Sequence, residues 1–167
     1  DTIQALRGHI NVKSKQGEGT TVTLRLPLTL AFLEAMVARI GKRLFVLPME
    51  EILEIFQMNL GDVETISATG EKVFHHRGEL VSFCSLVDFY GLEASDSTTT
   101  EAVVIVMETT FGKIAIPVDE LLGYQQVTLK PLEGQMAGIR AGGGCALLRS
   151  GEVAIALDAE RLHMRYN

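Results

Sequence analysis

Apolar and polar residues alternate along two short runs near the start of the chain, at residues 9–14 (HINVKS) and 21–28 (TVTLRLPL). A period of two predicts strands with one buried face. Residues 15–19 (KQGEG), between the two runs, supply the glycines of a hairpin turn. Residues 1–8 (DTIQALRG) read as the end of a helix that closes on a glycine. We therefore predict a helix and a hairpin over residues 1–28, which are too small to form a domain alone.

From about residue 35 the pattern changes to short apolar runs separated by turn residues. A pair of such runs with its turn predicts a β-hairpin. The four predicted hairpins are EAMVARI-GKR-LFVLP, KVFHH-RGE-LVSFC, VVIVME-TTFGK-IAIP and CALL-RSGE-VAIAL. Only brief helical patches separate them, so we expect a mainly β fold. Small barrels would remove its strand edges from solvent.

Two stretches of the sequence recur in the same order. Residues 47–57 (LPMEEILEIFQ) align with residues 116–126 (IPVDELLGYQQ) at an offset of 69. Residues 77–89 (RGELVSFCSLVDF) align with residues 150–162 (SGEVAIALDAERL) at an offset of 73. Two matches in one order indicate a duplicated β-module rather than chance.

The duplication divides the chain into two halves, at about residues 35–92 and 102–167, joined by the polar linker 93–101 (EASDSTTTE). Ser85 and Asp158 occupy the same position in the two halves, and each precedes a short helical stretch. Both residue types are good N-caps, so we predict a capped helix at the end of each half.

The composition is that of a folded protein with no general attraction to polyanions. Hydrophobic residues make up 47% of the 167, and the net charge is −6. Residues 1–28 carry four bases and two acids, which leaves 11 bases and 19 acids for the rest. Such a surface repels phosphate groups, so we expect no nucleic-acid partner.

Cysteine usage indicates a reducing, cytoplasmic setting. Cys84 and Cys145 are the only cysteines, they form no Cys-x-x-Cys pair, and no signal peptide precedes them. No apolar run approaches the roughly 20 residues of a membrane span, so we expect no direct membrane insertion. The chain begins at Asp1 without an initiator methionine, so we expect a fragment or a processed product.

No catalytic or metal-binding residue is predicted. His75 and His76 are adjacent, which points them to opposite faces of a strand, and no partner ligand lies at metal-binding spacing. Cys84 aligns with Leu157, which favours a core position over a nucleophile. Acidic pairs recur at matching positions beside prolines in both halves, which favours a structural role at a strand end. These pairs are Glu50 with Glu51, and Asp119 with Glu120.

Residues 16–21 (QGEGTT) hold a Gly-x-Gly-Thr turn, which alone is weak evidence for a nucleotide site. In context, residues 3–32 (IQALRGHINVKSKQGEGTTVTLRLPLTLAF) closely resemble the end of the ATP-binding domain in the chemotaxis sensor histidine kinase family (CheA). The remainder resembles the regulatory domain of the same family, a relative of the CheW coupling proteins. The segments that carry this second resemblance are RGELVSFCSLVDFYGL, IPVDELLGYQQVTLKPLE and GEVAIALDAERL.

The resemblance implies a CheW-like fold over residues 29–167, with two interwoven, SH3-like, five-stranded β-barrels that exchange strands. Residues 1–28 would be a helix-and-hairpin remnant of a GHKL-type ATPase domain. Thr20 would then be a remnant of the ATP pocket. ATP and Mg²⁺ would belong to the intact parent kinase, and we expect no cofactor for this chain.

The resemblance also implies a function in regulation and scaffolding. The family's domain docks onto CheW and onto the cytoplasmic tips of chemoreceptors in membrane-associated arrays, and couples receptor state to autophosphorylation of the parent kinase. Candidate docking residues are apolar ones that a small barrel cannot easily bury all at once, and each has a core alternative. They are Ile55, Phe56, Met58, Phe89 and Tyr90.

Two other functions stay open at this point. A stand-alone CheW-type coupling protein would share the fold, but it should lack residues 1–28. An ATP-using kinase fragment would be an enzyme, but no Mg²⁺ ligand set or adenine pocket accompanies the glycine turn.

Overall fold

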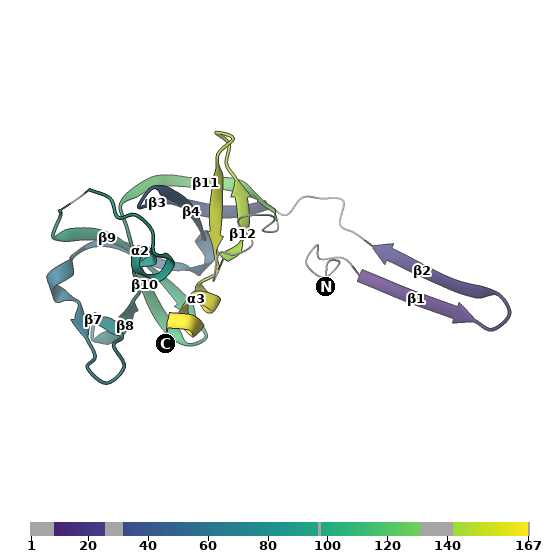
Figure 1. Cartoon of the computed structure of the whole chain (residues 1–167), viewed down its shortest axis with the longest axis horizontal. Helices are drawn as coiled ribbons and strands as arrows, with labels where there is room; N and C mark the ends of the chain where they lie inside the picture. The colour runs from purple at the N-terminus through teal and green to yellow at the C-terminus, as the bar shows by residue number, and fades with distance from the viewer. Residues whose placement is uncertain (1–8, 26–31, 97, 131–141, 167) are drawn as a thin grey trace. The chain divides into compact units, whose positions relative to one another are not determined.

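The computed structural model describes residues 9–25, 32–96, 98–130 and 142–166 (Figure 1). The chain divides into two units, residues 1–31 and 32–167. The predicted helix over residues 1–8 and the predicted boundary after residue 28 lie outside the described residues.

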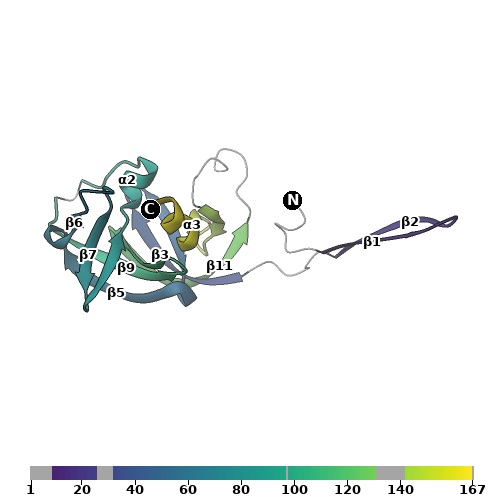
Figure 2. The same ribbon diagram turned by 90° about the horizontal axis from the view of Figure 1, so that it is seen from below.

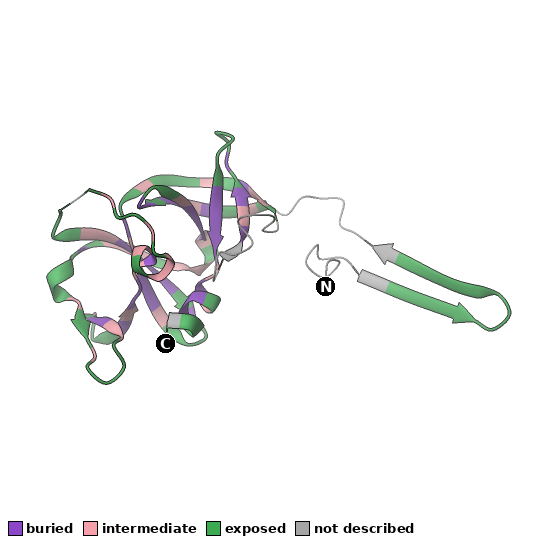
Figure 3. Ribbon diagram, in the orientation of Figure 1, coloured by how far each residue is buried: buried purple, intermediate pink, exposed green. Residues whose placement is uncertain are grey.

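The first unit contains one antiparallel hairpin, formed by β1 (His9–Lys15) and β2 (Gly19–Arg25). Gly17 and Gly19 in the turn have φ of 88° and 95°, a region that favours glycine. Val12 and Val22 are direct cross-strand partners and leave 59% and 57% of their surface exposed (Figure 3). The predicted hairpin is confirmed, and its valine pair is uncovered in this unit.

The described residues of the second unit form most of the strands and two short α-helices. Its elements in chain order are β3 (Phe32–Ile40), β4 (Arg43–Pro48), η1 (Met49–Glu51), β5 (Ile52–Asn59), η2 (Leu60–Asp62), β6 (Glu64–Thr65), β7 (Lys72–His76), β8 (Glu79–Phe83), α2 (Leu86–Tyr90), β9 (Glu101–Thr109), β10 (Gly112–Val118), β11 (Glu120–Lys130), β12 (Gly142–Leu147), β13 (Val153–Leu157) and α3 (Ala159–Tyr166). The four predicted hairpins are confirmed as the pairs β3–β4, β7–β8, β9–β10 and β12–β13.

Five strands form a closed barrel in the order β11-β12-β13-β4-β3, which we call the closed barrel. The β3–β4 hairpin comes from the first half of the chain, and the other three strands come from the second half. A parallel pairing of β13 with β4, in which Ile155 lies opposite Phe45, joins the two sets. The predicted interweaving of the barrels is therefore confirmed.

The other sheet has the order β5-β9-β10-β8-β7-β6, and here the β9–β10 hairpin is the part contributed by the second half. A parallel pairing of β10 with β8, in which Ile114 lies opposite Ser82, joins the two sets. This order repeats that of the closed barrel if β5 and β6 are counted as one interrupted strand. The chain itself then completes the ring between β5 and β6, so we call this sheet the broken barrel.

Equivalent residues in the two barrels follow from the pairing registers. Asn59 near the end of β5 lies opposite Glu101, just as Thr128 in β11 lies opposite Phe32. These pairs preserve the offset of 69 that the sequence repeat shows. Matching β-bulges also interrupt the starts of the two strands, between Ile52 and Glu54 in β5 and at the corresponding residues of β11.

The two barrels differ at the point where β5 ends. β11 continues beyond Thr128 to pair with β12, whereas the chain beyond Asn59 turns into the 3₁₀-helix η2. The Asn59 Oδ1 caps this turn by accepting a hydrogen bond from the Gly61 N–H at 2.8 Å. β6 then returns to the ring, where Glu64 pairs with Val73 of β7 (Figure 2). The second sheet thus keeps the strand order of the predicted five-stranded barrel, but it has six strands and backbone pairing does not close it.

Strands of the exchanged hairpins are buried on both faces, which explains their unbroken apolar runs. In β4, Phe45 and Leu47 belong to a cluster that draws on both barrels, while Val46 lies in the cluster inside the closed barrel. In β9, Ile105 belongs to the shared cluster and Val104 to the cluster of the broken barrel. The two barrels therefore share one apolar interface.

Polar side chains cap the starts of the two helices, as the sequence predicts. The Ser85 Oγ accepts a hydrogen bond from the Asp88 N–H at 3.4 Å and caps α2. Asp158 accepts one from the Arg161 N–H at 3.1 Å at the start of α3. The predicted N-caps are both confirmed.

Candidate functional site

The predicted docking residues of β5 are half-buried or buried. Met58 is only 8% exposed and lies in the core cluster of the broken barrel, and Phe56 packs against the same cluster. Ile55 alternates to the opposite face of β5 and packs partly against the shared interface. Burial therefore favours the core alternative for Met58 and Phe56. The Ile55 side chain stays partly exposed to solvent.

Phe89 and Tyr90 hold α2 against the shared interface. The Tyr90 ring stacks on Phe45 with centroids 6.0 Å apart, and it meets the Phe89 ring edge-on at 5.0 Å. The Tyr90 hydroxyl is buried with no hydrogen-bond partner among the described residues, and burial raises the pKa of Tyr90 to about 12. These contacts favour a packing role for both rings.

Side chains cross the gap between β5 and β7, where no backbone pairing is present in the described sheet. His76 Nε2 lies 2.7 Å from Glu54 Oε1, and the His76 ring stacks on Phe56 with centroids 4.3 Å apart and planes 9° from parallel. Arg77 Nη1 lies 3.4 Å from the second Glu54 oxygen. Phe56 therefore helps to close the broken barrel.

Thr20, the predicted remnant of an ATP pocket, lies in β2 with an exposed side chain. Its hydroxyl is 3.1 Å from the Ser14 hydroxyl across the hairpin. The structure brings no other predicted site residue to Thr20 within the described part of the first unit.

The other residues singled out in the sequence have packing or turn-forming contacts. Cys84 is fully buried in the shared interface, and burial raises the pKa of its thiol to about 12, so it is protonated at neutral pH. His75 is exposed while His76 faces inward, as adjacent strand positions require. Asp119 accepts a hydrogen bond from the Gly41 N–H at 2.6 Å, and Glu120 pairs with Arg39 at 2.9 Å. The structural role predicted for this acidic pair is confirmed.

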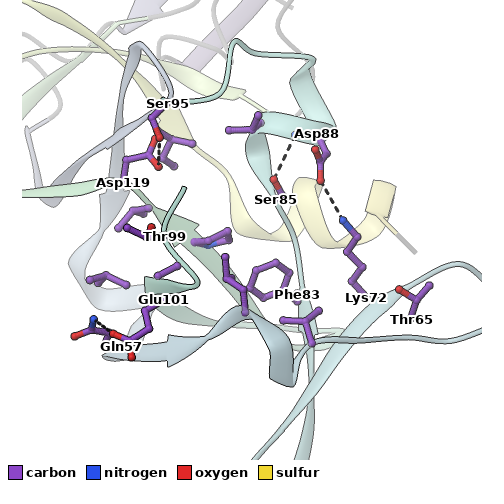
Figure 4. A pocket seen from close by; sticks show the side chains of 18 residues that line it. Gln57, Thr65, Lys72, Phe83, Ser85, Asp88, Ser95, Thr99, Glu101 and Asp119 are labelled. Atoms are coloured by element: carbon purple, nitrogen blue, oxygen red, sulfur yellow. Dashed lines mark hydrogen bonds and ion pairs between the residues drawn. The ribbon is translucent and has the colours of Figure 1, made fainter. Parts of the chain in front are cut away.

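A cavity of about 620 Å³ opens where the strand of the broken barrel is interrupted (Figure 4). Its lining comes from the end of β5, the η2–β6 segment, β7, β8, α2, the linker and the ends of β9 and β10. The apolar residues of the lining include Leu60, Val63, Phe83, Val87 and Val103. A cavity of this volume is in the range of binding pockets in proteins.

Polar side chains around this cavity are paired with one another. Lys72 Nζ lies 3.2 Å from Asp88 Oδ2, and the Gln57 amide donates to Glu101 at 2.7 Å. The Ser95 hydroxyl donates to Asp119 at 3.0 Å. Of the charged residues that line the cavity, three are acids and one is a base.

A row of exposed apolar side chains crosses the outside of the closed barrel. Phe32, Leu147 and Val153 leave 60%, 39% and 51% of their surface exposed. The registers place Phe32 opposite Thr128, Thr128 opposite Leu147, and Leu147 opposite Val153, so all four side chains share one face. We call these residues the apolar row.

Sequence reasoning missed the apolar row because its members are not close in the chain. Phe32 begins β3, Thr128 lies in β11 and the last two flank the β12–β13 turn. Only the exchange of the β3–β4 hairpin brings Phe32 beside β11. A comparison of the two halves of the repeat gives one useful signal for this surface, because most of the equivalent residues of the broken barrel are polar. They are Glu101, Asn59, His75 and Leu80.

Two exposed leucines mark the bulges of β5 and β11. Leu53 and Leu122 align in the sequence repeat and leave 46% and 41% of their surface exposed. Each follows a residue that packs on the shared interface, Ile52 or Leu121. The bulge inserts an extra residue and so turns the leucine out to solvent, which strict alternation along a strand does not predict.

The described residues offer no arrangement that suits metal chemistry, since no group of three or more His, Cys, Asp or Glu side chains among them is placed to hold an ion. In the same residues, no helix is both long and apolar enough to cross a bilayer. The exposed apolar surfaces and the cavity suit recognition of another protein.

Known proteins share this sequence and fold. The sequence matches the CheW-like domain family over residues 34–165. It is 32% identical to the chemotaxis protein CheA of Salmonella typhimurium over 96% of this chain and 24% of that protein. It is 30% identical to the chemotaxis protein CheA of Klebsiella aerogenes over 97% of this chain and 25% of that protein. The chain therefore spans about a quarter of the length of these relatives.

The fold also has a counterpart among solved structures. The scaffolding protein TtCheW from Thermoanaerobacter tengcongensis superimposes with a TM-score of 0.62, covering 78% of this chain and 91% of that one. The two sequences are 14% identical, so this likeness speaks for the fold alone. With the family match spanning both barrels, the chain belongs to the CheW-like domain family.

Proposed function

We propose that the chain is the C-terminal part of a chemotaxis histidine kinase, in which a CheW-like regulatory domain follows the end of an ATP-binding domain near residue 28. The likeness to Salmonella CheA covers 96% of the chain, whereas the family match begins at residue 34. Similarity to CheA therefore extends through most of the residues before that match. A stand-alone coupling protein would not need them.

The hairpin of the first unit supports the same proposal. A two-stranded hairpin is marginally stable in water, and this one exposes the Val12–Val22 pair. Further strands or helices of an ATP-binding domain would cover that pair in the parent, where Thr20 would join the pocket for ATP and Mg²⁺. For this chain alone we expect no saturable binding in a titration with labelled ATP and Mg²⁺. Saturation at micromolar ATP would instead favour the ATP-using fragment.

The second unit then acts in scaffolding and regulation at cytoplasmic chemoreceptor arrays. It docks onto a CheW-type coupling protein and onto receptor tips, and so couples receptor state to autophosphorylation of the parent kinase. The observation that carries the docking proposal is the apolar row, because exposed apolar side chains gathered on one face are typical of interaction sites. Ile55 and the bulge leucine Leu53 are secondary candidates on the broken barrel.

The repeat offers a matched pair of variants for testing this docking surface. Val153 and Leu80 occupy equivalent positions in β13 and β8, and both are about half exposed. We expect Val153→Lys to weaken binding of the coupling protein by at least about tenfold in calorimetry, because it places an unpaired charge in an apolar contact. Leu80→Lys should leave the affinity within about twofold of the unchanged chain.

Both variants should keep the native circular dichroism spectrum, since both side chains are exposed. Equal loss of binding in the two variants would contradict the proposal that the coupling protein docks on the closed barrel rather than on the broken barrel. Unchanged binding in Val153→Lys would contradict the proposed docking surface.

A further inference from the structure

The cavity of the broken barrel has a chemical character that the closed barrel lacks. Its lining includes the apolar residues Val63, Phe83 and Val87. The interruption of the strand creates it, since Leu60 and Val63 at either end of η2 both line it. It is large enough for more than one apolar side chain, at about 620 Å³.

Two segments that border the cavity carry acids and no bases. The η2–β6 segment, residues 60–65, contains Asp62 and Glu64, and both are exposed. The linker, residues 93–101, contains three acids. Together these segments hold five of the 21 acids of the chain and none of its 15 lysines and arginines.

The acids that line the cavity are paired, and Glu93 of the linker pairs with Lys42, whereas the two acids of the η2–β6 segment have unpaired carboxylates. Lys72, the one base among the described residues that line the cavity, pairs with Asp88. Among the described residues, neither the Asp62 carboxylate nor the Glu64 carboxylate has a hydrogen-bond or ion-pair partner. In the closed barrel, the strand position that matches Glu64 by its pairing is Lys130, so the negative rim is specific to the broken barrel.

We propose that this cavity anchors apolar side chains of a partner protein segment in which lysine or arginine residues flank them. The apolar side chains of the lining would take the anchor, and the unpaired carboxylates of Asp62 and Glu64 would attract the flanking bases. A small ligand fits less well, because the polar groups within the cavity are satisfied by one another. This inference rests on the proposed docking function and adds a second surface, distinct from the apolar row.

The test uses fluorescent synthetic peptides and the intact chain. One peptide is a short amphipathic helix with leucines on one face and lysines beside them. A second peptide has glutamates in place of the lysines, and a third has alanines in place of the leucines. Fluorescence anisotropy should show saturable binding of the first peptide, weakened at least about fivefold in each of the other two.

Two variants of the chain sharpen the test. Asp62→Asn with Glu64→Gln should weaken the basic peptide about fivefold at low salt, with a smaller difference at high salt because exposed charges are screened. Thr65→Phe, an exposed position on the cavity lining, should block the peptide by filling the space. The control Glu34→Gln with Glu108→Gln removes two exposed charges from other strands and should have little effect.

Each outcome decides the inference. Absence of saturation by the basic peptide, equal binding of the acidic or alanine peptide, or full binding to Thr65→Phe would overturn it. Binding of the coupling protein to Thr65→Phe separates the two proposals: if it persists while the peptide is lost, the cavity and the apolar row are independent sites. If the coupling protein never binds the unchanged chain, the docking proposal fails whatever the peptide does.

Discussion

The closed and broken barrels have equivalent strands in the same order, yet the side chains exposed at equivalent positions differ in polarity. Across the closed barrel, Phe32, Leu147 and Val153 form an exposed apolar row. At the equivalent place on the broken barrel lie Glu101, Asn59, His75 and Leu80. Duplication has therefore preserved the buried framework while the exposed positions diverged. Two copies of one module can in this way offer two different docking surfaces.

The difference has a local physical cause at residues 59–64. Asn59 caps η2, which carries the chain out of the ring before β6 restores it. The unbroken strand β11 fills the same place in the closed barrel. One three-residue insertion thus opens a cavity without changing the order of strands.

The largest effect is expected in the core that the two barrels share. Leu47 and Ile116 are equivalent by the repeat and both are fully buried in it. Leu47→Ala and Ile116→Ala should each lower the free energy of unfolding by about 2–5 kcal/mol, because each leaves a cavity. Urea unfolding followed by circular dichroism and by tyrosine fluorescence should give one coincident transition for both variants. Two separate transitions would mean that the barrels fold independently.

The next effect is expected at the β3–β4 turn. Gly41 has φ of 61° there, and its N–H donates to Asp119. A Cβ at this position would overlap the carbonyl oxygen of Glu93, so Gly41→Ala should cost about 1–3 kcal/mol in thermal unfolding.

The equivalent turn of the β9–β10 hairpin is the control for Gly41. Thr110 stands there, and its N–H donates to Glu160 at 2.6 Å. Thr110→Ala keeps that backbone bond and should cost less than Gly41→Ala. A larger loss in Thr110→Ala would show that the two turns are not anchored in the same way.

A smaller effect is expected from the cap that breaks the strand. Asn59→Ala removes the acceptor for the Gly61 N–H and should lower stability by about 1 kcal/mol. Thr128→Ala, at the same position of the unbroken strand, has no cap to lose and should cost within about 0.5 kcal/mol. Chemical denaturation of the two variants provides the measurement. Equal losses would argue against a special role for the cap at the break.

The smallest effect concerns the helices that end the two halves. His163 of α3 is buried, and its Nδ1 lies 2.6 Å from the Thr109 hydroxyl, whereas the equivalent residue of α2 is Tyr90. Burial lowers the pKa of His163, and Glu71 and Glu160 oppose this shift in part. A histidine with a lower pKa in the folded state gains its proton on unfolding. Stability should therefore fall as the pH drops through the unfolded value of about 6.5.

Replacing His163 with phenylalanine isolates this contribution from that of the carboxyl groups. The free energy of unfolding of His163→Phe minus that of the unchanged chain should become more positive as the pH falls from about 7.5 to about 5.5. A constant difference over that range would show that His163 does not titrate on unfolding.

Much of the fold was predictable because burial on both faces leaves a clear trace in sequence. Runs such as LFVLP and VVIVM predict strands, and the capping residues Ser85 and Asp158 predict the helices that follow them. The repeat predicts that both halves contain the same elements. Asn59 and Gly61 are ordinary turn residues, so the break in β5 has no equally clear trace.

The candidate docking residues were harder to predict, for a physical reason. Composition cannot distinguish a half-buried aromatic residue such as Phe56 or Phe89 from an exposed one, because either can pack on a small barrel. The apolar row depends on strand exchange, and the exposed Leu53 and Leu122 depend on bulges. Both features are decided by contacts between distant parts of the chain.

The most direct test of the account is a chemical-shift map of the isotopically labelled chain during titration with the coupling protein. Amide signals of the apolar row and of its neighbours in β3, β11, β12 and β13 should shift together. Signals of the equivalent row of the broken barrel, Asn59, His75, Leu80 and Glu101, should stay in place. Shifts confined to that equivalent row, or to the hairpin of the first unit, would contradict the assignment of docking to the closed barrel.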